Sequence, residues 1–334
     1  MSGIAGLYRL DGGPVDPVLL RAMTDAVAHR GPDGGDCWVD GPIGLGHRLL
    51  RSTPESAQEK QPLSDESGDL CLVLDGRIDN RGELRAALAP DGLRLRSDSD
   101  GELVLRAYAR WGTACPARLI GDFAFALWDN RERRLFCARD PLGVRPFYYH
   151  TDGRRFSVAS ELQQLLVDPS RAAEPNEGMI AEYLACEITH REDTLYRDIF
   201  RLPPGHSLVV RPGGHVVSPY WDIDPSRAIR HGTSRDYAEH FRDVFDEAVR
   251  CRLRSANPIA AELSGGLDSS SVVATAASLA PAGRATGDGV ETYSLVFPGH
   301  ACDESGYANQ VVALHALRSH TAPPSEPAPG WWRL

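Results

Sequence analysis

The chain has 334 residues, which is enough for two domains that each bury a core of their own. Hydrophobic residues make up 42% and charged residues 25% of the sequence, a globular composition that excludes a disordered or fibrous chain. The formal net charge of −10 leaves no basic surface of the kind that nucleic acids require, so we expect no nucleic-acid partner.

The N-terminal residues show no charged segment followed by an apolar core, and no apolar run has the length of a membrane span. The seven cysteines form no CxxC pair, which is typical of reduced thiols rather than of a disulfide framework. We therefore expect a cytoplasmic protein without membrane contacts.

The first part of the chain alternates short strand patterns with helical ones. Strands are predicted at residues 4–10, 43–49, 70–74, 123–128, 135–138, 147–149 and 156–160. Helices are predicted at residues 17–28, 83–88 and 102–110. Strands and helices in such runs indicate stacked antiparallel sheets with helices on their outer faces, in a first domain over residues 1–166.

Composition then divides the rest of the chain. Residues 167–233 are rich in Pro, Gly, Arg and Asp, so we expect a connecting region there. A second domain over residues 234–318 begins with a helix at 234–253, followed by a strand at 259–263, a Gly-rich turn, a helix from 270 to 279 and a strand at 292–297. This order predicts a βαβ unit of a parallel sheet. The Pro-rich residues 319–334 are predicted to form neither helix nor strand and to be disordered.

The string SGGLDSS at residues 264–270 stands between the predicted strand and helix. Adjacent Gly265 and Gly266 let backbone N–H groups converge on an anion, and a helix N-terminus adds partial positive charge. Asp268 has the chemistry to hold a magnesium ion that bridges phosphates. The hydroxyls that can donate to the anion are those of Ser264, Ser269 and Ser270.

This loop lacks the GxxxxGK[ST] form, and Lys60 is the only lysine of the chain. The pattern therefore favours a grip on the pyrophosphate that leaves in an AMP-forming reaction. The alternative is a tight strand-to-helix turn without a ligand.

The same string resembles the signature of the N-type ATP pyrophosphatases, and Tyr293–Phe297 resembles the strand whose backbone borders the adenine in that family. The resemblance implies ATP and Mg²⁺ as cofactors. The ATP-contacting residues that it implies are Leu263, Ser264, Gly265, Gly266, Leu267, Asp268, Ser269, Ser270 and Val296.

Residues 1–166 resemble the glutaminase domain of class B asparagine synthetases, through SGIAG at 2, HRGPDG at 29, LGHR at 45, GDFAFALWD at 121, RDPLGVRPFYY at 139 and ASE at 159. The resemblance implies an α/β protein with an αββα N-terminal-nucleophile-hydrolase sandwich, a type 2 glutamine amidotransferase domain, followed by a parallel-sheet ATP-pyrophosphatase domain. In such domains a Cys directly after the initiator Met attacks glutamine, with its own α-amino group as base.

The residues of that reaction are changed here. The nucleophile position is Ser2, and the glutamine-binding arginine of the family falls on Leu49. The family's Asn-Gly-Glu string reads Asp75, Gly76 and Arg77, and only Asp100 keeps its family identity. An Asp carboxylate cannot donate to an oxyanion, and Arg repels the glutamine ammonium. We expect an inert scaffold; a Ser-dependent amidase is the alternative.

Family members without the N-terminal Cys include β-lactam synthetases and lasso-peptide macrolactam synthetases. The resemblance implies an ATP-dependent ligase forming AMP and pyrophosphate, which adenylates an Asp or Glu side chain of a precursor peptide for lasso macrolactam formation. Expected partners are the precursor peptide and a leader-peptide-binding protein or protease. The sequence leaves the oligomeric state open. The alternatives are an asparagine synthase-type or β-lactam-synthetase-type ligase and, in another class, a non-catalytic scaffold that binds a peptide or protein.

The likeness fades near Val312, before the family's second loop of the type SGxGxDE and its pyrophosphate-stabilising lysine. The sequence thus suggests a truncated or frameshifted ligase. Asp303 and Glu304 open a predicted helix, and we expect them to cap it.

Overall fold

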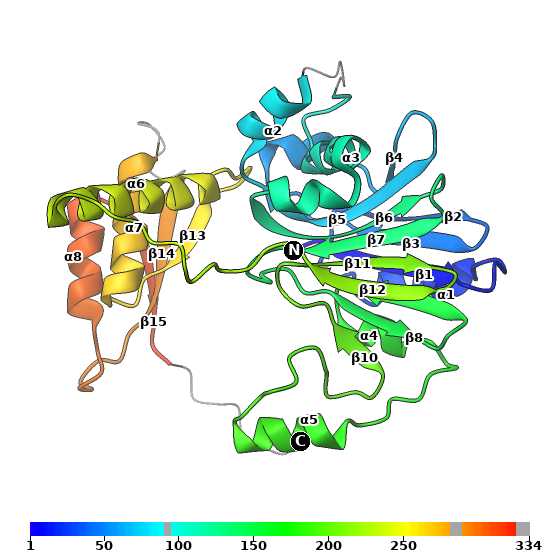
Figure 1. The fold of residues 1–334 in the computed structure, drawn as a ribbon. Coiled ribbons are helices and arrows are strands. Elements are labelled where there is room, and N and C mark those ends of the chain that lie inside the picture. Colours follow the sequence, from blue (N-terminus) through cyan, green and yellow to red (C-terminus); the bar gives the residue numbers. More distant parts are fainter. Residues whose placement is uncertain (90–94, 281–288, 325–334) are drawn as a thin grey trace. The chain divides into compact units, whose positions relative to one another are not determined.

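The computed structural model describes residues 1–89, 95–280 and 289–324, and it divides into two compact units (Figure 1). The first unit comprises residues 1–51 and 55–226, and the second comprises residues 52–54 and 227–334. Each unit has its own sheets and core.

The first unit contains two six-stranded sheets in which every paired strand is antiparallel. One sheet has the order β10-β8-β9-β1-β3-β2. Its strands are β1 (Gly3–Arg9), β2 (Gly35–Asp40), β3 (Ile43–Arg48), β8 (Tyr148–Thr151), β9 (Arg155–Ala159) and β10 (Ile199–Arg201). The other has the order β12-β11-β7-β6-β5-β4. Its strands are β4 (Leu63–Ser64), β5 (Leu70–Ile78), β6 (Gly121–Asp129), β7 (Arg134–Arg139), β11 (His206–Arg211) and β12 (Gly214–Pro219).

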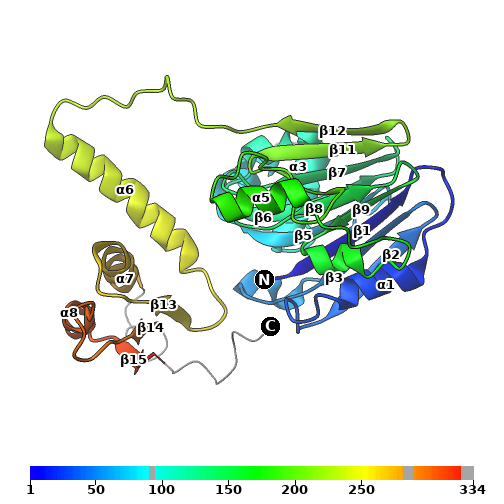
Figure 2. The same cartoon turned by 90° about the horizontal axis from the view of Figure 1, so that it is seen from below.

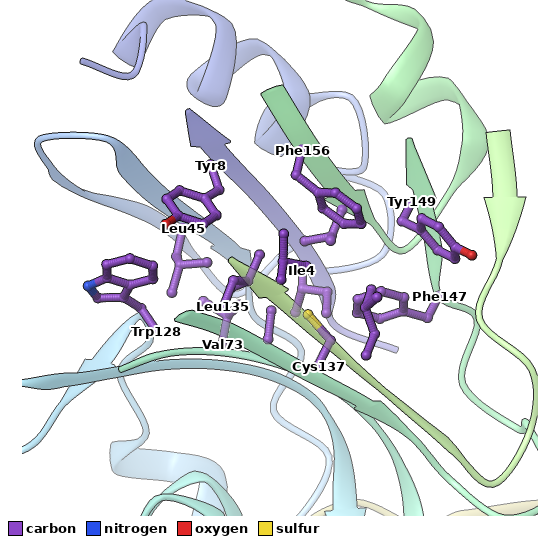
Figure 3. Packing of buried hydrophobic residues seen from close by; sticks show 14 of the residues in the cluster. Ile4, Tyr8, Leu45, Val73, Trp128, Leu135, Cys137, Phe147, Tyr149 and Phe156 are labelled. Carbon is purple, nitrogen blue, oxygen red and sulfur yellow. The ribbon is translucent and has the colours of Figure 1, made fainter. Parts of the chain in front are cut away.

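Successive side chains of a strand point to opposite faces of its sheet, so one face packs against the other sheet and the opposite face packs against helices. On β5, Cys71 and Val73 face the other sheet and pack with Ile4 and Trp128, as Figure 3 shows for this cluster. Their neighbours Leu70, Leu72 and Leu74 face the helices. Helices α2 (Arg81–Leu88) and α3 (Asp100–Trp111) cover the second sheet, while α1 (Pro17–Asp25) and α4 (Leu162–Leu166) cover the first. The predicted αββα sandwich is therefore confirmed.

The structure differs from expectation in the range 167–233, which is not a simple connector. It contains α5 (Glu177–Ala185) and the strands β10, β11 and β12 of the two sheets. The Pro-Gly strings that suggested a linker are turns at the ends of these strands; Gly205, for example, has φ +67°. The first unit consequently runs to residue 226 rather than to residue 166.

The second unit is built on a parallel sheet of β13 (Ile259–Glu262), β14 (Val290–Leu295) and β15 (Arg318–Ala322), in that order. Figure 2 shows α6 (Ser234–Arg252), α7 (Leu267–Leu279) and α8 (Ser305–His315) beside this sheet. Val249 and Ala276 pack on Val290, and Val273 and Ala308 pack on Leu263. All three helices therefore cover the same face of the sheet, as a βαβ arrangement requires.

The predicted disordered tail at 319–334 needs a correction at its start. His320 pairs with Tyr293 in the parallel ladder between β15 and β14, so residues 319–322 are part of a strand. The prolines begin only at Pro323, and backbone pairing up to Ala322 requires no particular side chains. Residues 325–334, to which the prediction of disorder also applies, lie outside the described part of the chain.

None of the seven cysteines, all of which lie in the described residues, forms a disulfide bond, and burial raises the pKa of the Cys71 thiol to about 12. Such a thiol is protonated and inert at neutral pH. Among the helices of the described residues, none combines the length and the apolar character needed to cross a membrane.

Candidate functional site

The first candidate site lies at the end of β5 in the first unit. Asp75 and Arg77 continue the alternation of Cys71 and Val73, so they belong to the face of β5 that is turned toward the other sheet. Asp75 is almost fully buried. A carboxylate in such a place needs charged or hydrogen-bonding partners.

Arg30 supplies the main partner. Its Nη2 donates to Asp75 Oδ2 at 2.9 Å, its Nη1 donates to Glu161 Oε1 at 2.9 Å, and its Nε donates to the carbonyl oxygen of Ser2 at 2.8 Å. Arg145 Nη1 lies 3.8 Å from the second oxygen of Asp75. Asp75 is thus held in a buried ion-pair network.

The charge of Asp75 follows from these contacts. Burial raises the pKa of its carboxyl group, while Arg145 and Arg30 act in the opposite direction. Between two guanidinium groups, the carboxylate is expected to stay ionised at neutral pH and to act only as an acceptor. It therefore offers no donor to an oxyanion.

Ser2 is buried, and its Oγ accepts a hydrogen bond from the backbone N–H of Leu50 at 3.1 Å. Through Arg30 the structure brings Ser2 and Asp75 into one network. Leu49 directly precedes Leu50 in the chain, and its apolar side chain is itself buried.

The remaining predicted positions have structural contacts of their own. At Gly76 an added Cβ would lie 2.6 Å from the carbonyl oxygen of Asp122 on β6, so close strand packing requires glycine there. Arg77 Nε donates to Asp79 Oδ1 at 2.9 Å. Asp100, at the start of α3, forms an ion pair with Arg81.

Sequence reasoning missed Arg30, Arg145 and Glu161 as members of this site. Each of them lies within a string that resembles the family, HRGPDG, RDPLGVRPFYY and ASE. Charged residues inside those strings were the available signal, but the pairing of Arg30 with Asp75 needs the sheet geometry.

The second candidate site is the loop between β13 and α7. Gly265 has φ +97°, and a Cβ at this position would lie 2.5 Å from the carbonyl oxygen of Glu304. Only glycine fits both the backbone conformation and the close approach. Gly266 follows as the N-cap residue of α7, with φ −68°.

The loop hydroxyls form a local network. Ser264 Oγ and Ser269 Oγ lie 3.0 Å apart, and Ser269 Oγ also accepts from the N–H of Ser264 at 3.2 Å. Helix α7 begins at Leu267, so Leu267, Asp268, Ser269 and Ser270 form its first turn. Within the described residues no side chain caps this helix, so its first N–H groups are open to an anion.

Asp268 is exposed in this first turn. The described residues contain no group of three or more His, Cys, Asp or Glu side chains that could hold a metal ion. With Asp268 as the protein ligand, the loop fits Mg²⁺ only if substrate phosphates and water supply most of the other ligands, which is how proteins commonly bind that ion. A groove of about 740 Å³ between α6 and α7 includes Asp268 in its lining but none of the loop serines from 264 to 270, so it lies beside the loop.

Val296 follows β14, and its backbone N–H donates to the carbonyl oxygen of Ala322 at 3.0 Å. That N–H is therefore not available to a nucleobase. Leu263, the last residue before the loop, is fully buried and anchors it to the core of the second unit.

The two candidate sites lie within residue ranges that match known families. Residues 1–221 match the glutamine amidotransferase domain family, and residues 240–326 match the asparagine synthase family. The chain belongs to the asparagine synthetase family. In this family context the Asp75 cluster occupies an amidotransferase domain, and the Ser264–Ser270 loop occupies an asparagine synthase domain.

Curated relatives match the chain over only part of their own length. The chain is 30% identical to amidase chry2 of Gibberella zeae, over 98% of this chain and 52% of that protein. It is 31% identical to asparagine synthetase (glutamine-hydrolyzing) 3 of Bacillus subtilis, over 77% of this chain and 42% of that protein. The chain thus spans about half the length of these two relatives.

A solved structure titled as the allosteric regulatory enzyme of purine biosynthesis covers 97% of this chain, and 81% of that protein is covered in turn. Its TM-score is 0.51 and its sequence identity is 16%, so the likeness concerns the fold alone.

Proposed function

We propose that the protein acts in an ATP-dependent, AMP- and pyrophosphate-forming ligase that joins a carboxylate to an amine. The observation that carries this proposal is the loop from Ser264 to Ser270, where Gly265 permits a backbone turn against Glu304 and the uncapped start of α7 faces the anion. Ser264, Ser269 and Ser270 donate to the pyrophosphate, and Asp268 holds the Mg²⁺ that offsets its charge. The nucleobase lies near Val296.

The amine does not come from glutamine in this proposal. The Arg30–Asp75 ion pair fills the position of an oxyanion donor, and Leu49 and Arg77 replace the groups that would hold glutamine. Loss of one oxyanion donor alone costs about 100-fold or more in rate. The nucleophile is then an amine of the substrate itself.

For the substrate we propose an Asp or Glu side chain of a precursor peptide, activated as the acyl-adenylate and attacked by the amine of the peptide's N-terminus to close a macrolactam. The partners would be that peptide and a leader-peptide-binding protein or protease, in the cytoplasm. An asparagine-forming or β-lactam-forming reaction uses the same adenylation step. These assignments rest on resemblance to the family members that lack the N-terminal Cys.

The test is incubation of the protein with ATP, Mg²⁺ and a candidate precursor peptide. Pyrophosphate release coupled to loss of one water from the peptide supports the macrolactam proposal. Asparagine formed from aspartate and an ammonium salt would support the asparagine-forming route instead.

A second function, a scaffold that binds a peptide without forming a bond, is favoured by the buried ion pair that closes the former glutamine site. Peptide binding that is indifferent to ATP and to Asp268→Asn would favour this function over the ligase.

A further inference from the structure

Asp303 joins the end of β14 to the start of α8. Its Oδ1 accepts hydrogen bonds from the backbone N–H groups of Phe297, at 3.1 Å, and Ser305, at 3.3 Å. Its Oδ2 accepts from the Ser305 hydroxyl at 3.0 Å. The bond from Phe297 is also the largest cause of the lowered pKa of Asp303, so the carboxylate is ionised at neutral pH.

The next residue, Glu304, touches the phosphate loop. A Cβ on Gly265 would lie 2.5 Å from the carbonyl oxygen of Glu304 and 3.0 Å from its Cβ. The same carbonyl oxygen accepts from the N–H groups of Tyr307 and Ala308, which fix its direction within α8. The start of α8 therefore supports the loop from one side at van der Waals distance.

These contacts form one continuous connection. It runs from Phe297, next to Val296, through Asp303 and Glu304 to Gly265 of the loop. Val296 and the loop are the two ends of the nucleotide site in the proposed function. We infer that Asp303 is a positioning residue that holds the nucleobase end and the pyrophosphate end of the ATP site at a fixed separation.

This inference rests on the proposed function and predicts a pattern that a merely structural role would not give. ATP touches both ends at once, so its affinity depends on their separation through the effective concentration of the second contact. AMP reaches mainly the nucleobase end, and pyrophosphate reaches only the loop. Asp303→Ala should therefore weaken ATP binding by about 10-fold or more while AMP and pyrophosphate change by less than about 3-fold.

The experiment measures the Kd of the full chain for ATP, AMP and pyrophosphate by calorimetry in the presence of MgCl₂. The variants are Asp303→Ala and Asp303→Asn, with Ser305→Ala as the matched control that leaves the contact between Asp303 and Phe297 in place. Asp303→Asn keeps one acceptor oxygen and should lose ATP affinity less than Asp303→Ala. If the alanine variant does not fold, the Kd values of Asp303→Asn for ATP, AMP and pyrophosphate test the inference instead.

An unchanged ATP affinity, or an equal loss for all three ligands, would overturn the role of Asp303. If the unsubstituted protein binds ATP but neither variant shows the selective loss, only this inference fails. If it binds none of the three ligands, the proposed function itself fails.

Discussion

Gly265 and Gly266 are neighbours in the loop, yet their surroundings differ. Gly265 has a positive φ and its Cβ position is blocked by the Glu304 carbonyl, whereas a Cβ on Gly266 would find its nearest atom, Ser264 Oγ, at 3.5 Å. We expect Gly265→Ala to destabilise the second unit by about 1–3 kcal/mol and to weaken pyrophosphate binding. Gly266→Ala is the control, and equal effects of both changes on pyrophosphate affinity would contradict this account of the loop.

Asp75 provides a second prediction for a single residue. Asp75→Ala leaves Arg30 and Arg145 beside an empty buried position, so it should lower the free energy of unfolding by about 3–5 kcal/mol. Asp75→Asn keeps an acceptor oxygen for Arg30 and should cost less. Urea unfolding of both variants measures the difference; an alanine variant as stable as the parent would show that the ion pair contributes nothing.

The buried ring of His47 should make the free energy of unfolding depend on pH. The ring is fully buried, its Nε2 lies 3.0 Å from the carbonyl oxygen of Leu74, and burial lowers its pKa to about 4. The unfolded chain takes up this proton below about pH 6.5, so the folded state loses up to roughly 3 kcal/mol as the pH falls from 6.5 to 4. His47→Gln should flatten that part of the pH–stability curve, and a curve that keeps its slope between pH 6.5 and 4 would contradict this account.

At this scale the sequence predicted what is local. The glycines, hydroxyls and Asp268 of the loop are adjacent in the chain, and a strand and a helix flank them. Arg30 and Asp75 are 45 positions apart, and only the stacking of the two sheets brings them together.

Among the elements, β10, β11 and β12 mark the main difference from the sequence prediction. Their range reads as a linker because its turns are rich in Pro and Gly, while the apolar residues that complete the sheets, such as Leu208 and Val210, are few and alternate. Long-range pairing with β7 and β8 decides their structure, and such pairing is not visible in a local pattern. The helices α6, α7 and α8 and the strands beside the phosphate loop followed from periodicity with shifts of a few residues.

This difference gives a prediction for fragments of the chain. A fragment of residues 1–226 should unfold cooperatively, since it contains all of the first unit. A fragment of residues 1–166 lacks β11 and β10, the strands that pair with the outer sides of β7 and β8. In this fragment β7 and β8 become exposed edge strands, so the fragment should aggregate or unfold at much lower urea concentration. Equal stability of the two fragments would show that β10 to β12 are dispensable.

For the whole molecule, the two units carry sites of opposite character. The amidotransferase unit has the αββα sandwich, and its candidate site holds the buried Arg30–Asp75 ion pair and the buried side chain of Leu49. The synthase unit holds the loop of the proposed phosphate site, in which Gly265 lies against Glu304 and the hydroxyls of Ser264 and Ser269 lie 3.0 Å apart. The functional contrast between the two sites was predicted from recognisable strings in the sequence, and it stays a prediction.

The central claim is that the Ser264–Ser270 loop binds the phosphates of ATP with Mg²⁺ at Asp268. Calorimetric titration of the protein and of Asp268→Asn with ATP, with and without MgCl₂, tests it most directly. The account predicts Mg²⁺-dependent binding that is lost or weakened at least about 10-fold in Asp268→Asn. Absence of ATP binding, or binding that is equal in the two proteins, would contradict it.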